Sequence, residues 1–387
     1  MNNIQTSEQY GPFIFFLASM CAGIAINKWQ KIRNLDNLDN SSITSSHKDI
    51  LKNAYLRFER EMDVNHLIPH VTEFAHQVAG HTKEVLVKYQ DKVLKPMIKK
   101  DLFLKEVLYY EEFAKASEVQ ANIVSPITYL PKYYGACTYK RILSSSSESF
   151  DELEYLVLDD MTSNFRHPCA MDVKMGTQTF EPSATTAKKE RELKKYVWQE
   201  EMGFRITGYK KYDVTTNKYD YREKTYGRSL HPTEVENAVE GFFNNGLLTR
   251  VDVIQVVIEK LEKLLRWFLI QRQYHFFCSS ILICYDGAVV DEIWESSNNV
   301  DVSQRVGWSS KAVSPEDLVE VKMIDLAHTI RCGNEEGQED VDLDHGYIHG
   351  LRVLLHMLEN LVNARARDGR LTESYKGRVG SLHGQSF

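Results

Sequence analysis

The sequence predicts an α+β protein built in two parts. Short apolar segments broken by turn residues fill the stretch from 74 to 97, which is typical of antiparallel strands, and a helical pattern follows them. In the second half of the chain the apolar spacing is mostly that of helices, with a few strand-like runs between them. We therefore expect a small, strand-rich lobe followed by a larger and more helical one.

Composition places the chain among ordinary globular proteins. Its 387 residues leave room for two or three domains of about 100–200 residues each. The 43% hydrophobic and 26% charged residues argue against a disordered or collagen-like chain. With 47 basic and 54 acidic residues the net charge is −7, so the overall charge does not indicate a nucleic-acid binder. The six scattered cysteines form no CxxC pair, which is typical of a reducing compartment such as the cytoplasm or nucleus.

The N-terminal segment is unusually apolar. Residues 11–26 contain no charge, and Lys28, Lys31 and Arg33 follow them. A membrane-spanning helix needs about 20 apolar residues, so this run is short for a span. A signal peptide would carry its positive charges before the apolar run, and here they come after it. The segment is either a membrane anchor that leaves the remainder of the chain in the cytosol, or a helix docked on the body, or a disordered leader.

The smaller lobe is expected over residues 48–160, after a leader and polar linker over 1–47. Asn, Asp and Ser clusters mark the linker. Asp101 is the predicted cap of the helix in this lobe. Strands are predicted over 76–82, 84–89, 93–97 and 153–160.

The larger lobe is expected over residues 161–372, followed by a tail over 373–387. Thr249 and Asp252 are three residues apart and predict a capping box at the start of its clearest helix. Strands are predicted over 203–212, 279–286 and 319–327, and helices over 235–243, 251–268 and about 351–361.

Two short motifs place an acid where a ligand can bind, and the first of them adds a lysine. In PCAMDVKMG (168–176), Asp172 and Lys174 are two residues apart in an extended run, so they project to one face. Such a pair can hold a sugar hydroxyl and a phosphate together, although a surface ion pair explains the pattern as well. In MIDLAH (323–328), an apolar strand ends on Asp325, which suits a hard cation bound with phosphates, or simply a strand-end turn.

Lys95 and Glu106 form a third pattern. Lys95 lies on the predicted strand VLKPM, and Glu106 follows eleven residues later on the predicted helix. Protein kinases use a strand lysine held by a helix glutamate to contact nucleotide phosphates. Two solvated side chains fit the same spacing.

The fourth pattern is the basic stretch TTAKKERELKKY (185–196). On a helix Lys188, Arg191 and Lys195 share one face, and Glu190 and Glu192 are expected to point elsewhere. A face of this kind is either a solvated surface or, beside a phosphate site, an anion clamp.

Together, these motifs resemble those of the inositol polyphosphate kinase family, both in their order along the chain and in the residues they contain. PCAMDVKMG fits the family's PxxxDxKxG signature, and MIDLAH resembles its IDFAH motif. CSSILICYDG (278–287) resembles the SSLLxxYD/E segment, and DHGYIHGL (344–351) resembles DxGYxxGL. Further matches are HQVAGHT, VLKPM, LPKYYG, LDDMT, EEMGFRITGYKKY and YGRSL. The resemblance covers about residues 70–365 and implies a two-lobed fold, similar to protein kinases and ATP-grasp enzymes, with ATP between the lobes.

The resemblance also implies roles for individual residues. Lys95, supported by Glu106, would contact ATP phosphates, and Lys174 would contact both the transferred phosphoryl group and the substrate. Mg²⁺ would be held by Asp325 with Ser280 nearby. The remaining ATP contacts would be Asp159 and Met161 to the adenine through backbone groups and Asp172 to the ribose. The other substrate phosphates would meet His328 and a basic wall formed by Lys188, Arg191, Lys195 and Lys210.

Within the family, LRWFLIQRQYHFFCSS (265–280), DVKMG and YGRSL are most similar to the multikinase branch, which phosphorylates inositol tris- and tetrakisphosphates. The extra charge of KKERELKKY, and Leu326 in place of the usual Phe of IDFAH, keep open a hexakisphosphate kinase that makes inositol pyrophosphates. A non-catalytic inositol-phosphate-binding scaffold is the second alternative. We expect a monomer whose ligands are inositol polyphosphates, ATP and Mg²⁺, with no nucleic-acid partner and with any membrane contact made through residues 11–26.

Overall fold

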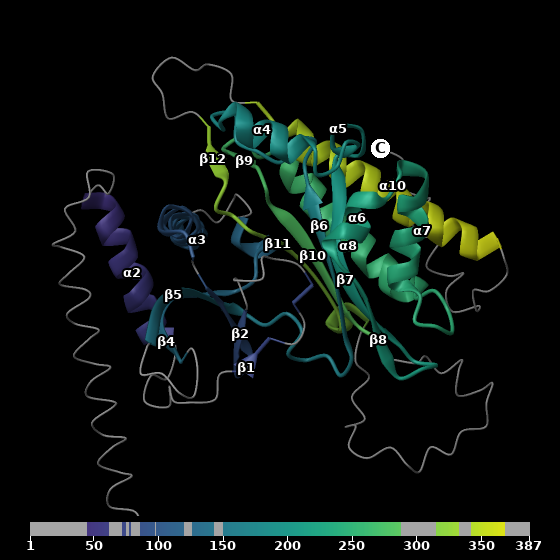
Figure 1. Cartoon of the computed structure of the whole chain (residues 1–387), viewed down its shortest axis with the longest axis horizontal. Coiled ribbons are helices and arrows are strands. Elements are labelled where there is room, and N and C mark those ends of the chain that lie inside the picture. Colours follow the sequence, from purple (N-terminus) through teal and green to yellow (C-terminus); the bar gives the residue numbers. More distant parts are fainter. Residues whose placement is uncertain are drawn as a thin grey trace, which may run out of the picture.

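The protein has two antiparallel sheets, each with its own helices, and Figure 1 shows the two lobes side by side. The computed structural model describes residues 45–61, 72–74, 77–78, 86–96, 98–119, 126–142, 150–287, 315–332 and 342–367. Over these ranges no helix is both long and apolar enough to cross a bilayer. The apolar run 11–26 lies outside them.

The smaller lobe is a five-stranded sheet in the order β1-β2-β3-β5-β4. Its strands are β1 (Thr72–Glu73), β2 (Val87–Tyr89), β3 (Lys92–Pro96), β4 (Tyr133–Ile142) and β5 (Phe150–Asp159). Two long helices, α2 (Ser45–Glu61) and α3 (Lys100–Val119), belong to this lobe, and a short 3-10 helix, η2 (Pro126–Tyr129), leads into β4.

The local patterns of this lobe are confirmed for most elements. The strands β2 and β3 form a hairpin whose turn includes Gln90 at a φ of 53°. Of the predicted strand HQVAGHT the structure describes Gln77 and Val78, and these two residues lie in no strand. The carbonyl of Val78 instead approaches Gly208 of the larger sheet so closely that a Cβ there would lie 2.4 Å from it. Asp101 lies in the first turn of α3 rather than at its cap, and α2 begins within the predicted linker.

The larger lobe has a five-stranded sheet in the order β11-β10-β6-β7-β8 and a separate hairpin of β9 with β12. The sheet strands are β6 (Pro168–Met175), β7 (Phe204–Asp213), β8 (Lys218–Arg222), β10 (Ser280–Asp286) and β11 (Val319–Ile324). The hairpin strands are β9 (Tyr274–Phe276) and β12 (Thr329–Arg331). The helices are α4 (Thr186–Leu193), α5 (Gln199–Met202), α6 (Lys224–Ser229), α7 (Pro232–Phe243), α8 (Val251–Phe268), η4 (Pro315–Leu318) and α10 (His345–Arg367).

Helices α7, α8 and α10 pack against one face of the larger sheet (Figure 1). Along β6, Met171 and Val173 point into this helical side and belong to a buried apolar cluster. Asp172 and Lys174 alternate with them and therefore project from the opposite face. The same apolar cluster continues into α2 and α3, so the two lobes share one core instead of forming two independent domains.

The predicted capping box of α8 is wrong. Arg250 is the residue at the N-cap, and its side chain makes no cap hydrogen bond. Arg250 is only 2% exposed, and its Nε donates to Asp252 Oδ1 over 2.8 Å. A buried guanidinium requires a carboxylate partner, so Asp252 is committed to Arg250. Thr249 instead donates its hydroxyl to Glu240 Oε1 over 3.0 Å.

A close contact between Gly203 and Gly350 generates a stability prediction. A Cβ at Gly350 on α10 would lie 2.1 Å from the Gly203 carbonyl oxygen, which is rigid backbone. We expect Gly350→Ala to lower the free energy of unfolding by about 2 kcal/mol, because α10 has to move away. Urea denaturation measures this change in the free energy of unfolding. Gly241→Ala on α7 is the matched control, since its Cβ would meet only Tyr209 Oη at 3.7 Å. The control should be stabilised by about 0.5–1 kcal/mol; equal effects of both changes would contradict the packing argument.

Candidate active site

A lysine of the smaller lobe joins acids from two other elements at the boundary between the lobes. Lys95 lies on β3, Glu106 on α3, and Asp325 directly after β11. Lys95 Nζ is 2.8 Å from Glu106 Oε1 and 2.7 Å from Asp325 Oδ1. The predicted contact between Lys95 and Glu106 therefore forms, and Asp325 is added to it across the cleft.

The backbone at Asp325 has an unusual conformation that brings this residue to Lys95 and Leu326 to Glu106. Its φ of 64° lies in the left-handed region, which is uncommon for a residue with a side chain. The next backbone N–H, of Leu326, donates to Glu106 Oε1 over 3.3 Å. Strained conformations of this kind cluster at functional sites. The turn after β11 is thus fixed by the glutamate that also holds Lys95.

The charges of the cluster stabilise one another. Burial by itself would raise the pKa of Asp325, but Lys95 and Lys174 lower it below its ordinary value of 3.8. Burial opposes the charge of Lys95 too, yet Asp325 and Glu106 raise its pKa above the ordinary value. The carboxylate and the ammonium are therefore both charged near neutral pH.

Asp172 and Lys174 lie on the cleft face of β6 as predicted from their spacing. Lys174 Nζ is 3.9 Å from Asp325 Oδ2 and donates to the carbonyl of Cys278 over 2.7 Å. Asp172 is 5% exposed, and burial raises its pKa. Lys174 acts in the opposite direction. The larger sheet thus presents two acids, Asp172 and Asp325, and one lysine, Lys174, toward the smaller lobe.

Ser280, which the resemblance places near the metal ion, is buried next to the strand end that carries Asp325. It lies on β10 opposite Lys174 and Ile324 and is 0% exposed. Its hydroxyl lies beside the Asp172 carboxylate and lowers the pKa of that group. The residue therefore supports Asp172 from the interior of the sheet.

The basic wall forms only in part. Lys188 and Arg191 lie on α4, whose N-cap Thr185 accepts a hydrogen bond from the backbone N–H of Lys188. The helix ends at Leu193, before Lys195. Glu192 does not point away as expected: it is 8% exposed, and its Oε1 accepts a 2.6 Å hydrogen bond from Lys195. The positive charge of Lys195 is thus neutralised by Glu192 within the protein.

Lys210 is not part of the wall. It lies on β7 opposite Ala170, four residues along β6 from Lys174, and is 2% exposed. Its ammonium lies 4.0 Å from the centroid of the Tyr219 ring on β8, so its charge is stabilised by an aromatic face. The β7 residue opposite Lys174 is Arg205, which is also buried and donates from Nη1 to Gln199 Oε1 over 2.6 Å. A bulge in β7 lies between Lys210 and Arg205, so residue alternation along the sequence does not identify this neighbour of Lys174.

His328 lies near the wall but has a protein partner. Its Nδ1 is 2.7 Å from Glu181 Oε1, which Lys105 of α3 also approaches to 3.3 Å. Burial lowers the pKa of His328, the charges of Lys188 and Lys105 lower it further, and Glu181 raises it. No sequence pattern singled out Glu181, because its role depends on α3 and β11 meeting in space.

A second contact between the lobes holds α3 in place. Glu112 Oε1 accepts a hydrogen bond from the Tyr274 hydroxyl over 2.7 Å and an ion pair from Arg331 over 3.0 Å. Tyr274 and Arg331 belong to the hairpin of β9 and β12. The helix that carries Glu106 is therefore bound to the larger lobe one and a half turns further along.

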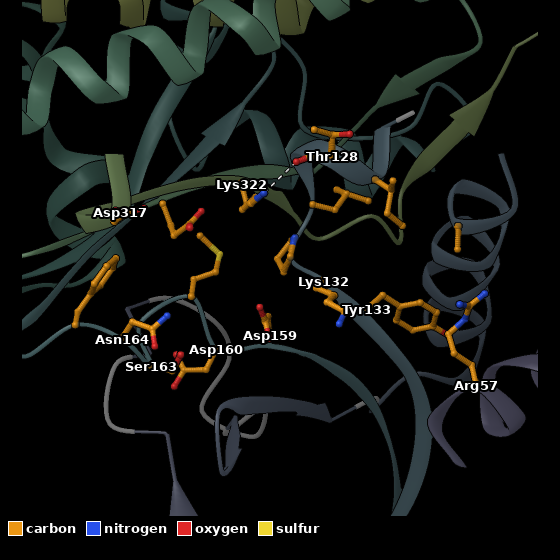
Figure 2. Close-up of a pocket in the computed structure, with 17 residues that line it drawn as sticks. Arg57, Thr128, Lys132, Tyr133, Asp159, Asp160, Ser163, Asn164, Asp317 and Lys322 are labelled. Carbon is orange, nitrogen blue, oxygen red and sulfur yellow. Dashed lines mark hydrogen bonds between the residues drawn. The ribbon is translucent and has the colours of Figure 1, made fainter. Parts of the chain in front are cut away.

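A cavity of about 530 Å³ lies beside the segment that joins the two sheets. This hinge segment, residues 159–165, contributes Asp159 and Met161 to the lining, and β11 and η2 face it from either side. Figure 2 shows Lys322 of β11 reaching Thr128, whose carbonyl accepts a 3.0 Å hydrogen bond from its ammonium. The cavity thus has walls from both lobes at the end of the cleft where the resemblance puts the adenine.

Comparison with known proteins agrees with the motifs. The sequence model of the inositol polyphosphate kinase family matches residues 155–359, which is more than half of the chain. The chain belongs to the inositol polyphosphate kinase family. The matched range contains Asp172, Lys174 and Asp325, whereas Lys95 and Glu106 precede it. The family assignment and the Lys95 contacts are therefore separate observations.

Curated relatives of this inositol polyphosphate kinase family member include two human enzymes. The inositol polyphosphate multikinase of Homo sapiens is 35% identical over 219 residues, covering 55% of this chain and 51% of the relative. The human inositol hexakisphosphate kinase 3 is 32% identical over 213 residues, covering 54% and 51%. The chain thus spans about half the length of these relatives. A crystal structure of an inositol phosphate multikinase from S. cerevisiae with ADP and Mn²⁺ aligns with a TM-score of 0.49 at 22% identity, covering 70% of this chain and 99% of that one.

The environment of His328 predicts a pH dependence of stability. Because its pKa in the folded protein lies below the ordinary 6.5, the unfolded chain binds more protons as the pH falls through this value. We expect the free energy of unfolding to decrease below about pH 6.5, and His328→Gln to weaken this decrease. Midpoints of urea unfolding, determined across the pH range, measure this decrease in stability. His356→Gln, at an exposed site on α10, should leave the slope unchanged; an unchanged slope in His328→Gln would refute the assignment.

Proposed function

We propose that the protein transfers the terminal phosphoryl group of ATP to a hydroxyl of an inositol tris- or tetrakisphosphate. The observation that carries this proposal is the contact of Lys95 with Glu106 and Asp325, 2.8 and 2.7 Å away. Lys95 of the smaller lobe and Asp325 of the larger lobe meet at this contact. A lysine there suits a nucleotide phosphate, and the carboxylate suits the metal ion bound to that phosphate. The family membership and the similarity to multikinases support the choice of substrate.

The nucleotide is proposed to bind along the cleft from the hinge to Lys95. The cavity beside Asp159 and Met161 has room for the base, and the buried carboxylate of Asp172 suits the ribose hydroxyls. Asp325 fits Mg²⁺, since it is an ionised carboxylate with 39% of its side chain exposed. When bound, this ion neutralises phosphate charge. Ser280 is left out of the metal site because its hydroxyl is buried.

The protein's own residues then act by position and charge. Lys95 would hold the ATP phosphates, and Lys174, on the other side of Asp325, would neutralise the phosphoryl group in transfer. Lys188, Arg191 and His328 would bind other phosphates of the substrate. A chain with a net charge of −7 needs such a local concentration of cations to attract a polyanion.

A hexakisphosphate kinase is the second candidate function. Five cations between residues 188 and 195 favour a heavily phosphorylated substrate, and the human hexakisphosphate kinase 3 is a relative at 32% identity. A non-catalytic inositol-phosphate scaffold is less well supported. Asp325 would repel phosphates in a pure binding site, so its position between Lys95 and Lys174 favours catalysis with a metal.

Several expectations from the sequence stay predictions. These are the lobe boundaries at residues 48, 160 and 372, the monomeric state, the lack of a nucleic-acid partner, and the cytoplasmic or nuclear location. Membrane contact through residues 11–26 lies outside the described residues.

The decisive experiment incubates the purified chain with ATP, Mg²⁺ and separate inositol tris-, tetrakis- and hexakisphosphates, and identifies the product isomers. We expect phosphorylation of the tris- and tetrakisphosphates. Pyrophosphate products from hexakisphosphate alone would favour the second candidate. If the chain binds these compounds but phosphorylates none, the scaffold is the correct function.

Replacing Lys95 or Asp325 tests the site itself. We expect Lys95→Met and Asp325→Asn each to lower kcat by about 100-fold or more, because each removes a charge that faces the phosphates. Lys99→Met, at an exposed lysine of the segment after β3, is the control and should keep full activity. Circular dichroism verifies that each variant is folded. Full activity in Asp325→Asn would eliminate the proposed metal site.

A further inference from the structure

Two large aliphatic side chains are exposed at the end of α4. Leu193, the last residue of the helix, is 52% exposed, and Val197 in the following turn is 74% exposed. Single exposed apolar residues are common and need no explanation. This pair differs because it lies within the most basic stretch of the chain.

The charges around this pair are strongly one-sided. Between residues 188 and 197 there are five cations and two acids. Glu192 is buried and accepts a hydrogen bond from Lys195, so Glu190 is the only exposed acid in this stretch. Lys194 and Arg191 are exposed beside Leu193. Two exposed apolar side chains therefore lie within a strongly basic stretch of a protein whose net charge is −7.

We propose that residues 188–197 dock onto an anionic lipid bilayer. Leu193 and Val197 enter the boundary between headgroups and acyl chains, and Lys189 and Lys194, which the proposed substrate site does not use, contact anionic headgroups. Interfacial segments combine these two features, and each Lys or Arg near such a surface adds about fivefold to the binding constant. The docking requires no step of the proposed kinase reaction.

The occupant is a membrane rather than a second copy of the chain. A symmetric contact through this surface would bring the same cations face to face, which is unfavourable. The two apolar side chains project outward, which suits insertion into a soft surface. Figure 1 shows α4 at the outer edge of the larger lobe, close to the hairpin of β9 and β12.

Vesicle sedimentation of the full chain tests the docking. The probes are vesicles of phosphatidylcholine alone and of phosphatidylcholine mixed with phosphatidylserine. We expect binding to the mixed vesicles only. Leu193→Ser with Val197→Ser should weaken it on the order of tenfold, because both apolar contacts are lost. Lys189→Gln with Lys194→Gln, two lysines outside the proposed substrate site, should weaken it by a similar factor.

The matched control is Leu247→Ser with Leu248→Ser. These leucines are 47% and 39% exposed in the loop before α8, outside any basic stretch. The control should bind mixed vesicles like the unchanged protein. Residues 11–26 are present in every variant, so they cannot cause a difference between them.

Three results would overturn the proposal. The first is equal vesicle binding by the Leu193/Val197 variant and the control, since the contact would then lie elsewhere. The second is no binding of the unchanged chain to mixed vesicles. The third is a dimer in size-exclusion chromatography that Leu193→Ser and Val197→Ser dissociate, because the surface would then meet a second copy. Thermal unfolding by circular dichroism ensures that the compared variants are folded.

Discussion

The structure depends on a single ammonium group shared between two carboxylates from different lobes. Lys95 Nζ lies 2.8 Å from Glu106 and 2.7 Å from Asp325. Removing one member of such a cluster leaves an uncompensated charge in a poorly solvated place, so β3, α3 and the end of β11 have to keep fixed relative positions. The left-handed backbone at Asp325 and the N–H of Leu326 bound to Glu106 are consequences of this requirement. These contacts fix where β3, α3 and the end of β11 lie relative to one another.

The elements with regular local periodicity could be predicted from the sequence. The hairpin of β2 and β3 and the helices α3, α8 and α10 have patterns that require only neighbouring residues. Gln77 and Val78 have the alternation of a strand but lie in none, and the absence of a side chain at Gly208 lets Val78 lie against the larger sheet. The capping box failed because a buried Arg250 competes for Asp252.

The candidate site was predictable in its residue types and less so in its contacts. Lys95 and Glu106 are close in sequence, so their pairing could be predicted, but Asp325 lies 230 residues further along and only the fold brings it to Lys95. Lys210 was assigned to the basic wall by the family resemblance, and its burial against Tyr219 depends on the pairing of β7 with β8. Charge patterns indicate which residues can bind an anion, while burial decides which of them are accessible.

The bridge from Glu112 to the hairpin of β9 and β12 affects how the protein unfolds. Because Tyr274 and Arg331 hold α3 from the larger lobe, and one apolar cluster runs through both lobes, the smaller sheet cannot lose its structure without exposing the interior of the larger one. The buried amide hydrogens of β3 and β6 should then exchange with solvent in one cooperative opening, with a similar protection factor. A molecule with two lobes in outline is, by this criterion, a single folding unit.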